Sequence, residues 1–366
     1  MRTPILSIVG LSCCLATFVA VGADVTSTGP YKPDSRADFL KLIDRPRVPL
    51  APETTAAAVS NGLAEIRFSY AVESTQRVPG IVIKSTHATG RRSAVILLHG
   101  TGGSKADELP LLRRVAGLGF VGVAIDGRYH GERALGGNSN KAYQEAILQA
   151  WHDQKQHPFF YDTVWDVMRL VDYLVTRDDV DASRIGLYGV SKGGIETYLT
   201  AAVDPRIAVA VPAIGLESFR WATENNSWQS RIETIQTAFD AAAVAAGVQS
   251  PDGAFVRAFY DRVAPGLDGE FDGPAMAPLI APRPFLTING ERDPRTPLPG
   301  LKLATDAAQA AYHAANADDH FVIRIQANTA HRVNPDSEQA AVDWFVKWLK
   351  PEPLTEASMP ANGIAR

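Results

Sequence analysis

The chain has 366 residues, and its 36 lysines and arginines stand against 40 aspartates and glutamates, for a formal net charge of −4. With 46% hydrophobic and 21% charged residues it resembles an average soluble globular protein, which excludes a disordered, collagenous or coiled-coil chain. There is no basic excess to neutralise phosphates, so we expect no nucleic-acid partner.

The first 23 residues are typical of a cleavable signal peptide. Arg2 supplies a positive charge, residues 5–21 form an uncharged and mostly apolar run, and small residues precede Asp24. The alternatives are an uncleaved membrane anchor or, less in keeping with the pattern, a lipoprotein signal around Cys13. We therefore expect a secreted or periplasmic protein with no stable membrane insertion after cleavage.

Both cysteines of the chain, Cys13 and Cys14, lie in this leader, so the mature protein would have no thiol. This excludes disulfides, cysteine-ligated metals and a cysteine nucleophile. No H-E-x-x-H motif is present, and the G-x-G-x-x-G match at 117–122 runs from helix into strand, opposite to a dinucleotide fingerprint. We expect neither a metal nor a cofactor.

The rest of the chain predicts an α/β protein. Residues 24–60 predict an extended arm with a short helix at 37–43, and residues 351–366 a loose tail. Between them, strands and helices alternate, which predicts a mostly parallel central sheet flanked by helices on both faces. The predicted strands are 62–74, 78–84, 94–98, 121–125, 185–188, 207–211, 284–288 and 321–326, and the predicted helices are 108–117, 163–176, 193–202, 301–315 and 337–349.

A helical and aromatic segment at about 215–277 interrupts this alternation and is too long for a simple crossover. We interpret it as a helical cap insertion over the active edge of the sheet, with a decorative insertion as the alternative. Trp221 and Trp228 would give a partly apolar substrate pocket, and Arg220 would bind a substrate carboxylate. For each of these three residues, packing or a surface charge is the competing explanation.

The strongest motif is G-x-S-x-G at 189–193, which follows one predicted strand and opens a predicted helix. This context is that of a nucleophile elbow, where a sharp turn exposes a serine hydroxyl in a strained backbone conformation. We predict Ser191 as the nucleophile. The backbone N–H of Lys192, at the helix N-terminus, is predicted as one donor of an oxyanion hole.

A second glycine-rich segment, His-Gly-Thr-Gly-Gly at 99–103, follows the buried strand 94–98. Glycines let backbone amides approach a reacting carbonyl group closely. We therefore predict the N–H of Thr101 as the second oxyanion donor, with Gly102 as the fallback. An ordinary turn at the end of the strand is the alternative.

For the general base we select His331, because it follows the strand 321–326 and so lies at the carboxyl edge, where open α/β sheets bind ligands. His320 precedes the same strand, which places it about 20 Å from that edge. His313 lies within a predicted helix and is expected at the surface.

For the acid we select Asp293, which comes just after the strand 284–288. The chain order serine, aspartate, histidine is the order of this architecture. The carboxylate would hold the histidine tautomer and stabilise the imidazolium. Glu291 and Asp126 are the competing candidates.

The segment Asp-Gly-Arg-Tyr-His-Gly-Glu-Arg at 126–133 is densely polar. We interpret it as a buried ion-pair network in which Asp126 is paired with Arg128 or Arg133, and the alternative is a lining for the substrate entrance. His130 has no cysteine or histidine at ligand spacing, so a metal site is not expected here.

Through these motifs the sequence resembles the α/β-hydrolase family, in particular the branch of dienelactone hydrolases, acetyl xylan esterases and prolyl-oligopeptidase-like enzymes, and their uncharacterised bacterial and plant relatives. The resemblance covers about residues 78–349 and implies Ser191 as nucleophile, Asp293 as acid and His331 as base. It is carried by LLHGTGG (97–103), DGRYHGER (126–133), DASRIGLYGVSKGG (181–194), NGERDPRTP (289–297) and TAHRV (329–333).

Two departures restrict what the resemblance implies. Dienelactone hydrolases have cysteine where this chain has Ser191, and about 90 residues before His99 are too few for the propeller of prolyl oligopeptidases. We therefore expect a catalytic domain at 61–350 that acts as a serine hydrolase on a small-molecule carboxylic ester. The alternatives are an exopeptidase or amidase, and a catalytically silent ligand-binding module. The oligomeric state cannot be read from the sequence.

Overall fold

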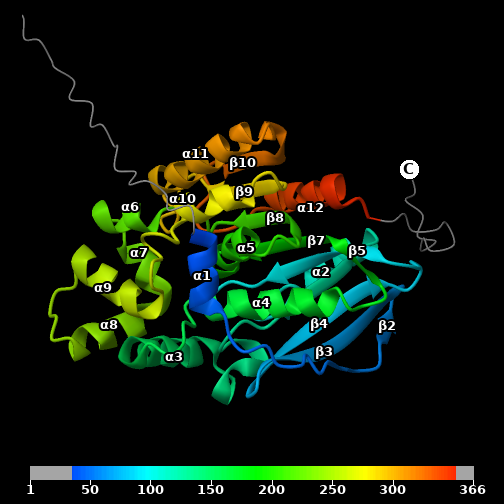
Figure 1. Cartoon of the computed structure of the whole chain (residues 1–366), viewed down its shortest axis with the longest axis horizontal. Helices are drawn as coiled ribbons and strands as arrows, with labels where there is room; N and C mark the ends of the chain where they lie inside the picture. Colours follow the sequence, from blue (N-terminus) through cyan, green and yellow to red (C-terminus); the bar gives the residue numbers. More distant parts are fainter. Residues whose placement is uncertain (1–34, 352–366) are drawn as a thin grey trace, which may run out of the picture. The chain divides into compact units, whose positions relative to one another are not determined.

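The structure, a computed structural model, describes residues 35–351, all within the unit Lys32–Arg366 (Figure 1). The predicted signal peptide and nearly all of the predicted tail lie outside the described residues. Among the helices of residues 35–351, none has the length and apolar character needed to cross a membrane.

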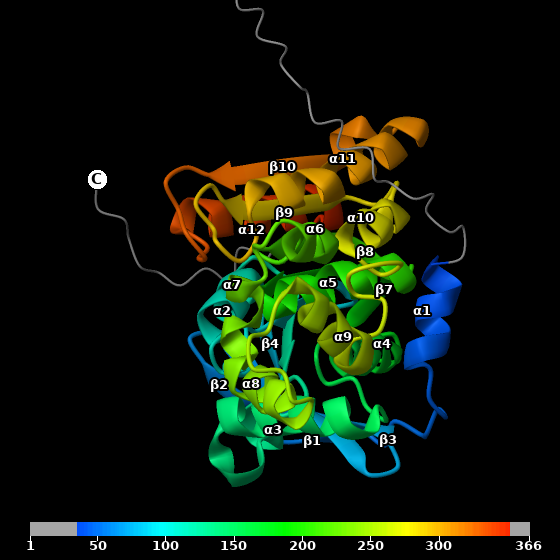
Figure 2. The ribbon, with the colours of Figure 1, turned by 90° about the vertical axis from the view of Figure 1, so that its left-hand side faces the viewer.

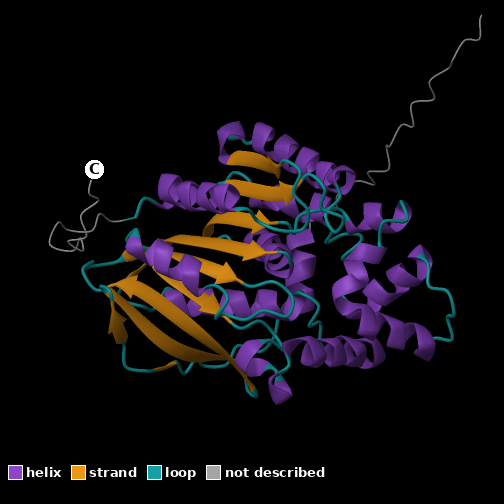
Figure 3. Cartoon of the chain, turned by 180° about the vertical axis from the view of Figure 1, so that it is seen from behind, coloured by secondary structure: helices purple, strands orange, loops and turns teal. Residues whose placement is uncertain are grey.

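Ten strands of the described range form one sheet in the order β1-β3-β4-β6-β5-β7-β8-β9-β10, with β2 also paired to β3. The pairs from β1 to β6 along this order are antiparallel, and those from β6 to β10 are parallel. Figure 3 shows the strands as one twisted layer with helices against it. The strands are β1 (Glu53–Thr54), β2 (Ala58–Ser60), β3 (Leu63–Glu73), β4 (Gln76–Ser85), β5 (Arg92–Leu98), β6 (Val121–Ile125), β7 (Val180–Val190), β8 (Ile207–Ala213), β9 (Phe285–Gly290) and β10 (Phe321–Gln326).

The central strand β5 is buried along its whole length. Ala94 and Ile96 belong to one hydrophobic cluster, whereas Val95 and Leu97 belong to another. Successive side chains of a strand point to opposite faces, so both faces of the sheet are covered. This arrangement confirms the predicted fold class.

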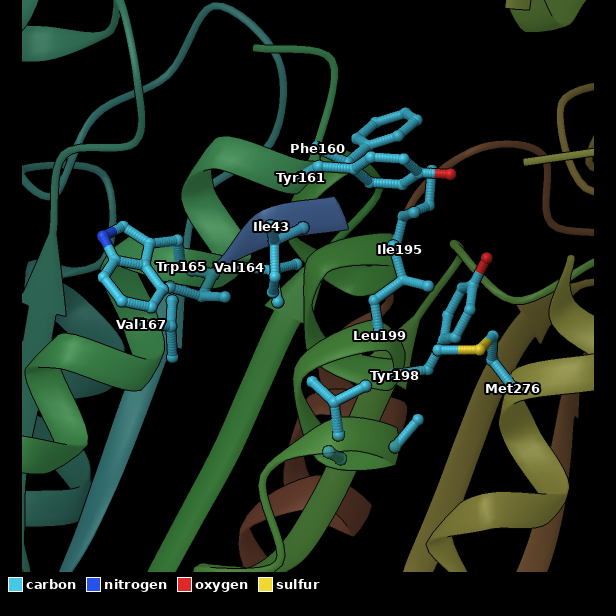
Figure 4. Close-up of a cluster of buried hydrophobic side chains, with 14 of the residues drawn as sticks. Ile43, Phe160, Tyr161, Val164, Trp165, Val167, Ile195, Tyr198, Leu199 and Met276 are labelled. Atoms are coloured by element: carbon cyan, nitrogen blue, oxygen red, sulfur yellow. The ribbon is translucent and has the colours of Figure 1, made fainter. Parts of the chain in front are cut away.

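The first cluster lies under α1 (Ser35–Ile43), α4 (Tyr161–Leu174) and α5 (Lys192–Val203), and the second under α2 (Leu109–Gly117) and α12 (Pro335–Leu349). Figure 4 shows Ile43 of α1, Val164 of α4 and Leu199 of α5 in one group of buried side chains. This packing anchors α5, which begins directly after the predicted nucleophile Ser191. Another long helix, α11 (Leu298–Ala314), connects β9 to β10.

Between β8 and β9 the chain forms α6 (Phe219–Glu224), α7 (Gln229–Ile232), α8 (Gln236–Ala245), α9 (Gly253–Val263) and α10 (Gly273–Met276). A further helix, α3 (Ser139–Asp153), comes from the segment after β6 and contacts α8 and α9 (Figure 2). Trp151 of α3 stacks on Phe259 of α9, with ring centroids 5.7 Å apart. The sequence analysis did not predict α3, although Asn138 accepts a hydrogen bond from the N–H of Lys141 as a helix N-cap would. That the β8–β9 segment acts as a cap stays a prediction.

Candidate active site

Ser191 lies at the turn between β7 and α5. Its backbone has φ 56° and ψ −114°, a conformation that is strained for a residue other than glycine. The N–H of Ser191 donates to the carbonyl oxygen of Ala213 at 2.9 Å, which holds the turn against β8. This hydrogen bond with β8 helps to hold the strained backbone of Ser191, as expected for a nucleophile elbow.

Glycine is required on both sides of this serine because the backbone is too close for a side chain. A Cβ atom at position 189 would lie 2.2 Å from the carbonyl oxygen of Gly193. A Cβ atom at position 193 would lie 2.3 Å from the carbonyl oxygen of Leu98. The first turn of α5 can reach the end of β5 only without these atoms.

The three predicted triad residues meet at the carboxyl edge of the sheet. His331 Nε2 lies 2.8 Å from Ser191 Oγ, and His331 Nδ1 lies 2.8 and 2.9 Å from the two carboxylate oxygens of Asp293. Asp293 follows β9 and His331 follows β10, and these neighbouring parallel strands end side by side. A hydrogen bond of 2.9 Å from the N–H of Arg292 to the carbonyl oxygen of Thr329 connects the two loops.

The environment of Asp293 favours its charged form. Burial raises the pKa of this carboxyl, but the hydrogen bond and the charge of His331 lower it, as do hydrogen bonds with Thr296 and with the N–H of Arg295. The net effect is a pKa below the ordinary value. Asp293 is thus a carboxylate that accepts from His331 Nδ1–H, which leaves Nε2 free to accept the proton of Ser191.

The competing residues have other partners. Glu291 accepts a hydrogen bond from the N–H of Asn328 at 2.6 Å. His320 bonds to the carbonyl oxygen of Pro282 before β9, at the amino end of the strands, and His313 is exposed beside Asp318. None of these side chains is brought to Ser191.

Both predicted oxyanion donors lie beside Ser191. Lys192 is the first residue of α5, so its N–H has no carbonyl partner one turn earlier in the helix. Its ammonium group is buried against Glu196. Thr101 lines both cavities that contain Ser191, whereas Gly102 lines neither of them.

His99 holds the loop that carries Thr101, a role that the sequence analysis missed. Its Nδ1 lies 2.8 Å from the carbonyl oxygen of Gly100, and its Nε2 accepts from the N–H of Gly127 at 3.0 Å. Burial, followed by the charge of Lys192, lowers the pKa of His99 to about 4. The imidazole is therefore neutral at pH 7, with its proton on Nδ1. Its position after β5, at the same sheet edge as Ser191, was the signal available in the sequence.

Two cavities of very different size meet at Ser191. The larger has a volume of about 510 Å³ and is lined by Ser191, His331 and residues from the N-terminal ends of α2 and α12. The smaller has a volume of about 20 Å³, and its apolar wall consists of Phe159, Phe160 and Ile195. The site thus offers a narrow compartment, walled on its apolar side by these three residues, and a much wider one, and both have polar as well as apolar groups in their lining.

The three substrate-binding residues predicted in the β8–β9 segment do not line either cavity. Arg220 Nε donates to the carbonyl oxygen of Asp268, Trp221 lies against Gly300, and Trp228 packs against Phe239. Arg220 is exposed and both tryptophans pack against other residues, so a direct contact of these three with substrate stays a prediction. Arg231 and Arg295, which the sequence analysis did not select, line the small cavity.

The polar segment 126–133 does form a buried ion-pair network, but the predicted pairing of Asp126 is wrong. The Asp126 carboxylate binds Lys105, through both the N–H at 2.8 Å and Nζ at 2.5 Å. Arg128 and Arg133 instead donate to Asp166 of α4. Lys105 comes from the loop after β5, which lies beside β6 in the sheet, so this partner is a neighbour only in the folded chain.

The strand order, the serine elbow and the histidine between serine and aspartate define an α/β-hydrolase. A family model described as "Acetyl xylan esterase (AXE1)" matches residues 55–237, which is half of the chain. The chain therefore belongs to the acetyl xylan esterase (AXE1) family. It is a serine hydrolase of carboxylic esters, as the sequence predicts.

The individual proteins similar to this chain share about a quarter of its residues or fewer. YtaP of Bacillus subtilis (strain 168), assigned as a hydrolase, is 25% identical over 287 residues, which cover 75% of this chain and 84% of YtaP. The 4-O-methyl-glucuronoyl methylesterase of Hypocrea jecorina is 26% identical over 348 residues, or 90% of this chain and 68% of that protein. The crystal structure of acetyl xylan esterase 1 from Thermoanaerobacterium matches with a TM-score of 0.65 at 19% identity, over 88% of this chain and 95% of that one. This last likeness concerns the fold.

Proposed function

We propose that Ser191, His331 and Asp293 are the nucleophile, base and acid of this esterase, and that the N–H groups of Thr101 and Lys192 bind the oxyanion. The observation that carries the proposal is the row of short contacts from Ser191 Oγ through His331 to Asp293, each of 2.8 to 2.9 Å. These are the distances at which a base accepts a proton from a nucleophile while an acid orients the base.

In the proposed reaction, Ser191 Oγ attacks the ester carbonyl carbon and its proton moves to His331 Nε2. The carbonyl oxygen takes the negative charge, and the two backbone amides stabilise it. The intermediate collapses when His331 returns the proton to the leaving alcohol, which leaves an acyl group on Ser191. Water then repeats the sequence, with His331 as base, and releases the carboxylic acid and the free serine.

We further propose that the acyl group is short, with acetyl as the preferred one. The cavity of about 20 Å³ between Phe160 and Ile195 has room for about one or two water-sized groups, which fits a methyl group. The alcohol would then occupy the cavity of about 510 Å³. A relative is a glucuronoyl methylesterase, but a uronoyl group on the acyl side does not fit the smaller compartment.

Two measurements test this proposal. A fluorophosphonate probe should label Ser191 in the folded protein, and Ser191→Ala should abolish both labelling and turnover of p-nitrophenyl acetate. In a series of p-nitrophenyl esters, kcat/KM should fall from acetate to butyrate and octanoate. Absence of labelling where a control esterase reacts, or faster turnover of aminoacyl anilides than of esters, would refute the proposal.

We also propose that the protein is exported, with residues 1–23 as the signal peptide. The support is the charged start, the apolar run and the small residues before Asp24. N-terminal sequencing of the protein from the periplasm or the medium would test this. A full-length N-terminus in the cytoplasmic fraction would contradict it.

A further inference from the structure

The loop that carries Asp293 is held in place by α7 of the β8–β9 segment. Ser230 Oγ donates to the carbonyl oxygen of Pro294 at 2.5 Å, and Arg231 Nη1 donates to the carbonyl oxygen of Arg295 at 2.8 Å. Pro294 and Arg295 are the two residues that directly follow Asp293. A segment inserted between β8 and β9 thus binds the backbone of the loop that supplies the proposed acid.

Both of these contacts are made to peptide groups that also bind Asp293. The N–H of Arg295 and the carbonyl of Pro294 belong to one peptide group, and the N–H of Thr296 and the carbonyl of Arg295 belong to the next. The two N–H groups donate to Asp293 Oδ1 at 2.9 and 3.3 Å. A trans peptide group is planar, with its N–H and C=O pointing in opposite directions. By holding the far end of each peptide group, α7 therefore orients the two donors toward the carboxylate.

Arg231 is the more firmly fixed of the two donors that α7 supplies. Its side chain is only 6% exposed, it forms an ion pair with the fully buried Glu217, and its guanidinium carbon lies 4.1 Å from the ring centroid of Phe219. The bond of Ser230, by contrast, is exposed to solvent. A guanidinium presents its donors in a rigid fork. Because a carboxylate and an aromatic ring already fix this fork, its remaining donor is placed at a defined point.

We propose that Arg231 is a positioning residue for the catalytic acid. By fixing the second of the two peptide groups, it holds the Asp293 carboxylate in the orientation in which both oxygens lie 2.8 to 2.9 Å from His331 Nδ1. This role rests on the proposed function, because Asp293 is the acid only in that scheme. Arg231 also lines the small cavity, so a direct contact with the acyl group is the competing explanation.

The test removes Arg231 and measures the hydrolysis of p-nitrophenyl acetate and butyrate. Arg231→Leu is combined with Glu217→Gln, so that no buried carboxylate is left without its partner, and is compared with Glu217→Gln alone. We expect the removal of Arg231 to lower kcat by about 10²-fold on both esters alike, because a misplaced acid slows the chemistry whatever the acyl group. Arg231→Lys, whose ammonium group can still donate to the carbonyl oxygen of Arg295, should keep part of this kcat.

The decisive measurement is whether Arg231 acts through Asp293. With Asp293→Asn in place there is no carboxylate to orient, so removal of Arg231 should then cost less than about threefold in kcat, against about 10²-fold when Asp293 is present. Equal losses with and without Asp293, an unchanged kcat, or a loss confined to one of the two esters would overturn the inference. If the variant without Arg231 does not fold, Arg231→Met with Glu217→Leu, which replaces the ion pair by apolar side chains, takes its place in the same comparison.

Arg262→Leu is the matched control. Arg262 lies on α9 of the same segment, its Nε donates to the carbonyl oxygen of Trp151 at 2.6 Å, and its guanidinium carbon lies 4.7 Å from that tryptophan ring. These contacts are of the same kind as those of Arg231, but they connect α9 to α3, so their loss should lower the thermal unfolding midpoint and leave kcat unchanged. An equal loss of kcat in Arg262→Leu would overturn the inference. Failure of the proposed function has a different signature, namely a folded Asp293→Asn that keeps its kcat.

Discussion

Replacing Asp293 by asparagine tests the proposed triad with little change in shape. The asparagine oxygen can still accept the hydrogen bonds that Asp293 receives from the N–H groups of Arg295 and Thr296, at 2.9 and 3.3 Å. Its amide nitrogen, however, would face His331 Nδ1 as a donor. The histidine would then carry its proton on Nε2, 2.8 Å from Ser191 Oγ, where it cannot accept the serine proton.

The expected loss follows from this change of tautomer. With the geometry kept and the tautomer wrong, such a substitution lowers kcat by about 10⁴-fold. Each factor of ten corresponds to about 1.36 kcal/mol, so Asp293→Asn should remove about 5 kcal/mol of transition-state stabilisation. The folded structure should persist, because the loop keeps its hydrogen bonds.

The assay is steady-state hydrolysis of p-nitrophenyl acetate together with the rate of fluorophosphonate labelling, and thermal unfolding verifies the fold. Glu291→Gln is the matched control, because Glu291 lies two residues earlier and bonds to Asn328 rather than to His331. If folded Asp293→Asn keeps more than a tenth of kcat, or if Glu291→Gln loses as much activity, the assignment of Asp293 as the acid is refuted.

Three further results are expected. Ile195→Ala should widen the small cavity and raise kcat/KM for butyrate relative to acetate at least tenfold in the p-nitrophenyl series; an unchanged acetate preference would contradict the acyl-site assignment. Gly193→Ala should destabilise the fold by roughly 3 kcal/mol or more, because its Cβ would meet the Leu98 carbonyl oxygen at 2.3 Å, and denaturant unfolding measures this. Glu108 has its pKa raised from 4.5 to about 7, so the folded state binds the proton more tightly than the unfolded chain and loses stability as pH rises from 4.5 through 7. In the unchanged protein, the loss in free energy of unfolding should reach about 3 kcal/mol above pH 7, and Glu108→Gln should not show it. If the free energies of unfolding of the two proteins change in parallel with pH, burial does not raise the pKa of Glu108.

Much of the site could be predicted because its residues follow strands. The glycines around Ser191 mark a turn whose geometry is local, and Asp293 and His331 each come a few residues after a strand end. In a parallel sheet these ends meet at one edge, so chain positions 140 residues apart in the case of Ser191 and His331 become neighbours. Only the order of the strands was needed to bring the three side chains together.

The ion-pair partners near the site and the residues that line its cavities could not be predicted in the same way. Asp126 binds Lys105 from the loop of a neighbouring strand, and Trp221 and Trp228 line neither of the cavities at Ser191 although they lie in the expected segment. The direction of a side chain on a short helix is decided by what that helix packs against. Here part of the packing comes from α3, a helix inserted elsewhere in the chain.

The amino-acid sequence by itself determined the strand and helix pattern, the serine elbow and the chain order of nucleophile, acid and base, because each depends on short-range periodicity and turn chemistry. The tertiary structure alone decided the size of the two cavities, the neutral state of His99 and the raised pKa of Glu108. Those properties depend on burial and on charges brought together from distant segments, and neither is encoded in the immediate neighbours along the chain.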